Sequence, residues 1–105
     1  MKVTFLLPLA DNDGTAFPGP QVDSILSRLT RQFHGCSTDG KVDGRSLDEG
    51  VEHHDISLRV TIVCEKDQLN SVRACVAEIG RELHQKSMYF EVRDYDGVQI
   101  LPTGL

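Results

Sequence analysis

The chain has 105 residues, of which 39% are hydrophobic and 26% charged, a balance typical of a folded domain rather than of a disordered segment. This length suits a single domain, residues 1–105, with one modest core. The formal net charge of −5 and the lack of a basic run disfavour general nucleic-acid binding, because an acidic surface repels phosphate.

A membrane role is equally disfavoured by the sequence. The longest apolar run, residues 5–10, is interrupted by Pro8 and is far too short to span a bilayer. The three cysteines, Cys36, Cys64 and Cys75, are odd in number and form no C-x-x-C pair, so they do not suggest a disulfide framework. We therefore expect reduced thiols and a cytoplasmic location.

The first strand and the first helix are predicted from their apolar patterns. Residues 2–9 form a nearly continuous apolar run that is typical of a central strand, and a turn follows at residues 11–14. A helix is predicted over residues 20–34, and Gly35 stands where a left-handed C-cap belongs. The apolar stripe of this helix consists of Val22, Ile25, Leu26, Leu29 and Phe33.

The middle of the chain has a weaker pattern. Residues 36–50 contain three turn-forming pairs and little apolar material, which predicts a short, irregular edge strand or a β-ribbon. Strict alternation predicts a strand over residues 56–64, and a second helix follows over residues 67–83 with Asp67 as its N-cap. Gly80 interrupts the apolar stripe of that helix, and a close approach between helix and sheet would explain it.

Alternation predicts a further strand over residues 87–93, and residues 98–101 could add a short fifth strand. The resulting order, strand-helix-strand-strand-helix-strand, predicts a ferredoxin-like βαββαβ two-layer sandwich of the α+β class. Right-handed crossovers place both helices on one face of the antiparallel sheet.

The opposite, open face of this sheet is the predicted working surface. It would carry Thr4, Leu6, Arg59, Thr61, Val63, Tyr89, Glu91 and Arg93. This mixture is too apolar for a fully hydrated face, and in a small domain such a face is often covered by a second subunit. We therefore expect a homodimer.

Four residues of the open face are the candidate ligand-binding residues: Arg59, Tyr89, Glu91 and Arg93. Together they could bind a small polar ligand or take part in acid–base chemistry. The simpler interpretation is an ordinary cross-strand ion pair between Glu91 and Arg59.

Residues of the types that bind zinc also occur, but their spacing argues against a metal site. His53 and His54 are adjacent, so on a strand they point to opposite faces. No H-E-x-x-H or paired C-x-x-C occurs, which favours surface histidines. Residues 11–14 lack the flanking acidic residues of a calcium loop. We expect neither a metal nor a cofactor.

Three stretches of the chain show a resemblance to known proteins: residues 5–14 with 17–18, residues 33–38 and residues 85–91. Together they resemble a group of small, stand-alone bacterial proteins of ferredoxin-like type. No activity is assigned to that group, so the resemblance implies a self-contained domain and no particular function. The chain departs from the group's pattern after Gly44, where a tryptophan is expected, because it contains none.

These observations lead to two functional hypotheses, and whether the protein is an enzyme stays open. The first is a small binding or regulatory module that acts as a homodimer through its sheet face. The alternative is a small dimeric enzyme, oxygenase- or isomerase-like, with a pocket between the helices and the sheet. Fold analogy alone supports that alternative.

Overall fold

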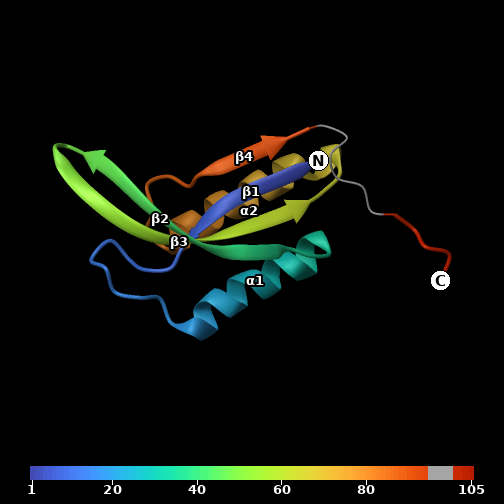
Figure 1. The fold of residues 1–105 in the computed structure, drawn as a ribbon, viewed down its shortest axis with the longest axis horizontal. Coiled ribbons are helices and arrows are strands. Elements are labelled where there is room, and N and C mark those ends of the chain that lie inside the picture. Colours follow the sequence, from blue (N-terminus) through green and yellow to red (C-terminus); the bar gives the residue numbers. More distant parts are fainter. Residues whose placement is uncertain (95–100) are drawn as a thin grey trace.

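A computed structural model of the chain describes residues 1–94 and 101–105. One antiparallel sheet runs through it, with the strand order β2-β3-β1-β4 (Figure 1). The elements in chain order are β1 (Lys2–Pro8), α1 (Gly19–Phe33), β2 (Ser37–Asp48), β3 (Val51–Val63), the 3-10 helix η1 (Lys66–Gln68), α2 (Leu69–Glu82) and β4 (Phe90–Arg93).

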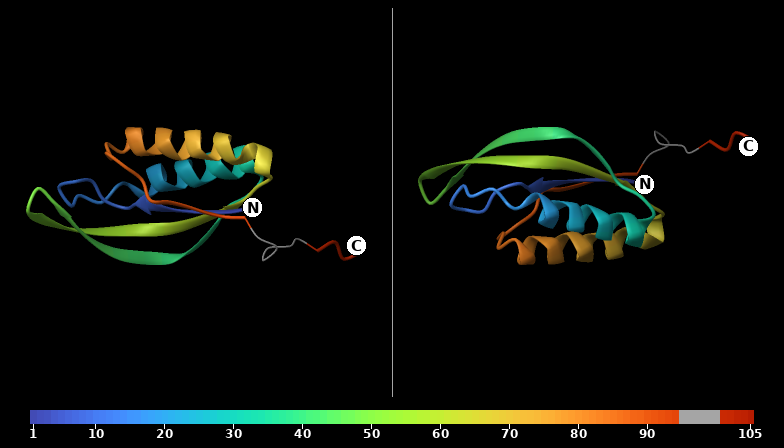
Figure 2. Two further views of the ribbon diagram at one scale, coloured as in Figure 1. Left: turned by 90° about the horizontal axis from the view of Figure 1, so that it is seen from above. Right: turned by 90° about the horizontal axis from the view of Figure 1, so that it is seen from below.

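Both helices lie on the same face of the sheet, as Figure 2 shows from two sides. The predicted ferredoxin-like α+β layout is therefore confirmed. Alternate residues of β1, namely Val3, Phe5 and Leu7, are fully buried against the helices, and Val60 and Ile62 of β3 join them. The helices contribute Ile25, Leu29, Phe33, Val72, Cys75, Val76, Ile79 and Leu83 to this core.

The helix ends differ in detail from the prediction. Helix α1 ends with His34 in the left-handed conformation, at φ 66°, so the left-handed cap lies one residue before the predicted Gly35. Asp67 is not the N-cap of the second helix. Instead, Glu65 and Gln68 form a capping box around η1, in which the Glu65 N–H donates to Oε1 of Gln68 at 3.0 Å.

The largest difference from the sequence prediction is the hairpin of β2 and β3, called here the β2–β3 arm (residues 37–57). β2 is a strand of 12 residues rather than a short one, and β3 has 13 residues and begins at Val51 instead of residue 56. Glu49 and Gly50 both have positive φ, as a tight type I′ hairpin turn requires. The arm extends past the ends of β1 and β4 (Figure 1) and is nearly all exposed.

The predicted irregularity of this region is present as a register shift between Thr38 and Lys41. Gly40, at φ 110°, lies inside the shift and adopts a backbone conformation that side chains disfavour. The apolar pattern missed the outer part of the arm because backbone pairing, rather than core burial, holds it in place.

The segment between α2 and β4 explains why residue 80 of the helix is a glycine. A Cβ atom at this position would lie only 2.7 Å from Cγ of Met88, so Met88 packs directly on the helix backbone. Met88 precedes the sheet, because β4 begins at Phe90 rather than at the predicted residue 87. Of the possible fifth strand, residues 98–100 lie outside the described residues.

A bidentate ion pair joins the outer surfaces of the two helices. Nη1 and Nη2 of Arg28 donate to the two carboxylate oxygens of Glu82 at 2.8 and 3.1 Å. This hydrogen bonding lowers the pKa of the Glu82 carboxyl and raises that of Arg28. Neither helix of the described chain is long and apolar enough to cross a membrane.

Candidate functional site

The strand register places three of the four predicted site residues, Arg59, Glu91 and Arg93, on the open face of the sheet, and Tyr89 directly precedes β4. Thr4 of β1 lies opposite Thr61 on one side and Glu91 on the other. Cross-strand partners share a face, and the neighbouring Phe5 is buried against the helices, so these residues point away from them. By the same register Arg59 lies opposite Leu6, and Arg93 lies opposite Lys2.

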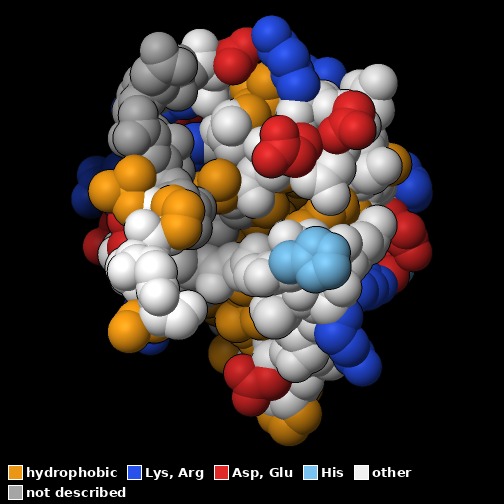
Figure 3. Space-filling model, turned by 90° about the vertical axis from the view of Figure 1, so that its right-hand side faces the viewer, with side chains coloured by type: hydrophobic (Ala, Val, Ile, Leu, Met, Phe, Trp, Pro, Cys, Tyr) orange, Lys and Arg blue, Asp and Glu red, His pale blue; other side chains and the backbone are white. Residues whose placement is uncertain are grey.

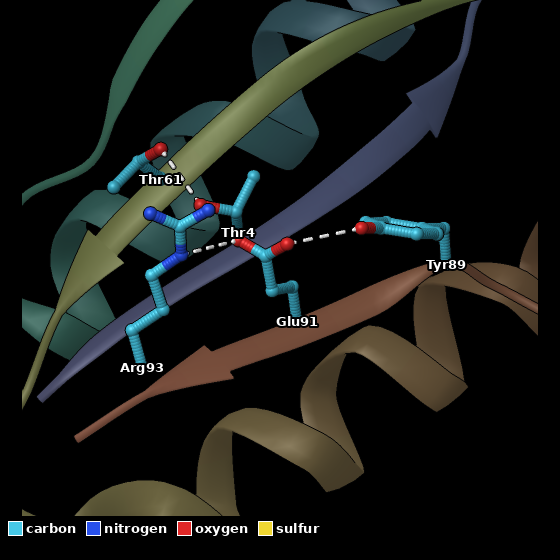
Figure 4. Close-up of polar contacts among 5 residues, drawn as sticks. All are labelled: Thr4, Thr61, Tyr89, Glu91 and Arg93. Atoms are coloured by element: carbon cyan, nitrogen blue, oxygen red, sulfur yellow. Dashed lines mark hydrogen bonds and ion pairs between the residues drawn. The ribbon is translucent and has the colours of Figure 1, made fainter.

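Three of the four predicted residues form one polar network (Figure 4). The Tyr89 hydroxyl donates to Oε2 of Glu91 at 3.1 Å, and Nε of Arg93 donates to Oε1 of the same carboxylate at 3.0 Å. The hydrogen bond to Glu91 raises the pKa of Tyr89, so the phenol remains neutral and donates at physiological pH. Glu91 and Arg93 are two residues apart on one face of β4, and Tyr89 extends this spacing to the residue just before the strand.

Arg59 does not join this network. Its Nη1 lies 3.6 Å from Oδ2 of Asp39 on the neighbouring β2. The predicted ion pair between Arg59 and Glu91 is therefore wrong. The reason is the strand order: β1 lies between β3 and β4, so the two residues are not on adjacent strands. Arg59 still acts on the site electrostatically, because its positive charge opposes the rise in the Tyr89 pKa.

A groove of about 740 Å³ adjoins this network at the end of the sheet where the β2–β3 arm extends outwards. Its walls are the loop after β1, the arm, and the segment between α2 and β4. The lining residues are Leu6, Pro8, Ala10, Asp11, Asn12, Gly14, Ser46, Leu47, Asp48, His53, His54, Asp55, Ile56, Ser57, Gln85, Lys86, Ser87, Met88 and Tyr89. Tyr89 thus belongs both to the groove and to the network on the open face.

Side-chain contacts connect the loop after β1 to the segment after α2. Oδ1 of Asp11 accepts hydrogen bonds from the N–H groups of Asp13 and Thr15, each at 2.9 Å, which shapes the loop. Asn12 then donates to the carbonyl of His84 at 3.3 Å and accepts from Gln85 at 3.4 Å. These contacts hold the loop after β1 against the segment after α2, so the two segments together form one wall of the groove.

The arm meets the segment after α2 through one exposed ion pair. Nζ of Lys86 lies 3.9 Å from Oδ2 of Asp48. Such a pair contributes little to stability, on the order of 0.5 kcal/mol. The arm forms the outer wall of the groove. Its ion pair to the segment after α2 is a weaker connection than the hydrogen bonds that join the loop after β1 to the same segment.

Apart from Tyr89, the residues that line the groove were not predicted from the sequence as site residues. Residues 11–14 were interpreted only as a turn, and the pocket of the enzyme hypothesis was expected between the helices and the sheet. That space is filled by the buried core. The only sequence signal was the polar loop 11–14 itself, whose partner Gln85 is distant along the chain.

The residues considered as metal ligands have other surroundings. Nε2 of His54 lies 3.0 Å from Oε1 of Glu52, both exposed on the arm. Within residues 1–94 and 101–105, no three His, Cys, Asp or Glu side chains form a group that could hold a metal ion. Burial raises the pKa of the Cys64 and Cys75 thiols, which disfavours their thiolates as nucleophiles.

Comparison with known proteins gives structural neighbours but no family. No family profile and no curated protein sequence matches the chain. In structure, the chain is similar to a phage SAM lyase in complex with S-methyl-5′-thioadenosine, with a TM-score of 0.71 and 16% identity over 89% of this chain and 79% of that chain. The apo phage SAM lyase gives a TM-score of 0.55 and 16% identity over 90% of each chain.

At this level of identity the likeness shows a shared fold alone; the name of the neighbour describes that protein as a lyase. The implied membership of a bacterial, stand-alone group stays a prediction, since no sequence family matches.

Proposed function

We propose that the protein is a small enzyme that binds S-adenosylmethionine (SAM) and releases S-methyl-5′-thioadenosine from it. The proposed site is the groove together with the adjoining Tyr89–Glu91–Arg93 network. The observation that carries the proposal is the structural match to a phage SAM lyase complexed with S-methyl-5′-thioadenosine, at a TM-score of 0.71 over 89% of the chain.

The size and lining of the groove support a nucleoside ligand. Its volume of about 740 Å³ lies inside the usual range for small-molecule pockets. A nucleoside presents a flat aromatic base and a pair of ribose hydroxyls. Leu6, Ile56 and Met88 offer apolar contact for the base, while Asn12 and Ser57 offer hydrogen-bonding groups for the hydroxyls.

The network on the open face suits the other end of the substrate, which carries a sulfonium, an ammonium and a carboxylate group. A cation is stabilised over an aromatic ring and beside a carboxylate, and Tyr89 and Glu91 provide both. The guanidinium of Arg59 is available for the substrate carboxylate if it leaves its exposed partner Asp39. Because Tyr89 belongs to both parts, one extended ligand can reach from the groove to the network.

The proposed cleavage balances without an oxidant or reductant. The product keeps the methyl group, the sulfur and the adenosine, so the bond that breaks joins sulfur to the γ-carbon of the amino acid. Its electron pair goes to sulfur and neutralises the sulfonium. The four-carbon fragment then closes through its own carboxylate or loses a proton to form a double bond. In the second route the proposed proton acceptor is Glu91, the carboxylate of the network beside the groove.

Replacing Tyr89 with alanine should weaken binding of S-methyl-5′-thioadenosine about 10-fold, because the adenine base or the sulfur atom of the ligand loses its contact with the tyrosine ring. Tyr89→Phe is the matched control: it keeps the ring, loses only the hydroxyl contact to Glu91, and should bind the thioether nearly as well as the wild type. Titration calorimetry measures binding, and chromatography measures release of the thioether from SAM. A wild-type protein that neither binds nor releases it would overturn the proposed function.

The second candidate is a homodimeric binding or regulatory module that uses the open sheet face. Its support is the exposure of two large side chains on that face, Val63 at 42% and Tyr89 at 55%. Light scattering should then give about twice the monomer mass of 11.7 kDa, and Val63→Asp should give the monomer mass. Val51→Asp, at the exposed tip of the arm, is the matched control and should leave the mass unchanged. A wild-type monomer at tens of micromolar would contradict this candidate.

A further inference from the structure

Negative charge is concentrated in the β2–β3 arm. Residues 37–57 contain six carboxylates against Lys41 and Arg45, so they carry a formal charge of −4 out of the −5 of the whole chain. The six are Asp39, Asp43, Asp48, Glu49, Glu52 and Asp55. At the opposite end of the molecule, acidic and basic side chains are interspersed (Figure 3). The arm, which forms one wall of the groove, therefore carries most of the net negative charge of the chain.

The groove itself has an excess of carboxylates. Lys86 is the one Lys or Arg side chain among its lining residues, and Asp48 already pairs with it at 3.9 Å. Asp11, on the loop wall, and Asp55, on the arm wall, have no cationic partner in the part of the chain that the structure describes. Two carboxylates thus border the groove without a protein cation to neutralise them.

The network beside the groove contributes an aromatic ring rather than net charge, because Glu91 is paired with Arg93 at 3.0 Å. The hydrogen bond to Glu91 raises the pKa of Tyr89, so the tyrosine stays protonated and its hydroxyl donates to the Glu91 carboxylate at 3.1 Å. An aromatic ring with a carboxylate behind it attracts a cation more strongly than the ring alone. Two carboxylates without a cationic partner, Asp11 and Asp55, therefore border the groove, and the Tyr89 ring lies at its edge.

We propose that the site selects cationic adenosine sulfonium or ammonium compounds over neutral adenosine thioethers, with Asp55 as a specificity-determining residue. This inference rests on the proposed function. SAM carries a net charge of +1 at neutral pH, whereas S-adenosylhomocysteine and S-methyl-5′-thioadenosine are neutral overall. The same charge difference favours departure of the thioether product, which lacks the positive charge of its parent.

The test compares ligands that differ chiefly in charge. Sinefungin resembles S-adenosylhomocysteine but carries an extra ammonium group at the position of the sulfur, and it lacks the sulfonium bond that would be cleaved. By titration calorimetry at low salt, sinefungin should bind about 10-fold more tightly than S-adenosylhomocysteine. The ratio should shrink at high salt, because the groove is open and its charges are screened.

Asp55→Asn should weaken sinefungin binding about 5-fold and leave S-methyl-5′-thioadenosine binding unchanged. The matched control is Asp67→Asn, since Asp67 is exposed in η1 at the other end of α2. It should change neither affinity. Equal affinities for sinefungin and S-adenosylhomocysteine, with the thioether still bound, would overturn the charge selection and leave the proposed function standing. Absence of binding by all three compounds would overturn both.

Discussion

Replacing Phe5 with alanine should lower the free energy of unfolding by about 3–5 kcal/mol. Phe5 lies in the central strand β1, is fully buried, and pairs with Val60 on one side and Phe90 on the other. Its removal leaves a cavity beneath both helices that the surrounding side chains can fill only in part. Because small domains are stable by only about 5–15 kcal/mol, much of the protein should unfold at a moderate urea concentration. Urea titration followed by circular dichroism measures the loss.

The matched control for Phe5 is its neighbour Leu6. Leu6 points to the open face and lines the groove, so Leu6→Ala should cost roughly 1 kcal/mol. The comparison tests the layer arrangement directly, since two adjacent residues of one strand are predicted to differ several-fold. Equal costs at the two positions would mean that the helices do not cover the face to which Phe5 points.

Replacing Gly80 with alanine should destabilise the protein by about 1–2 kcal/mol, although alanine is the better helix former by roughly 1 kcal/mol. The added methyl group would lie 2.7 Å from Cγ of Met88, so Met88 must leave its position on α2. Met88 also lines the groove, and its displacement should disturb the wall near Tyr89.

A double mutant separates the two effects at Gly80. In a Met88→Ala background the contact is gone, and Gly80→Ala should become stabilising by about 0.5–1 kcal/mol through helix propensity alone. The change of sign is the decisive result, and urea titration of the four proteins measures it. If Gly80→Ala has the same effect in both backgrounds, Met88 is not what requires the glycine.

Apolar periodicity was sufficient to predict the core elements of the fold. The buried residues of β1, α1 and α2 repeat at the spacing of a strand or a helix, and the inner half of β3 alternates strictly. The outer half of the β2–β3 arm has no such pattern, because it buries almost nothing and relies on backbone pairing. The Glu49–Gly50 turn was visible in the sequence, but its role in aligning two long strands depends on pairing that composition does not reveal.

The candidate site was predictable only in part. Tyr89, Glu91 and Arg93 alternate in the sequence, so the prediction of a strand over residues 87–93 gave them a shared face; in the structure they form one network although β4 begins only at Phe90. The pairing of Arg59 did not follow, because it depends on which strand lies beside which. The groove joins three segments that are far apart in the chain, and loop contacts such as Asn12 with Gln85 leave no local signal.

The arm also has a consequence for how such a protein can diversify. A hairpin that projects beyond the core can lose or gain residues in pairs, one on each strand, without changing which way the remaining side chains point. Shortening or lengthening it would make the neighbouring hollow shallower or deeper while the packed layers stay as they are. Ligand size could thus be adjusted by small insertions and deletions at the turn, with little penalty to folding.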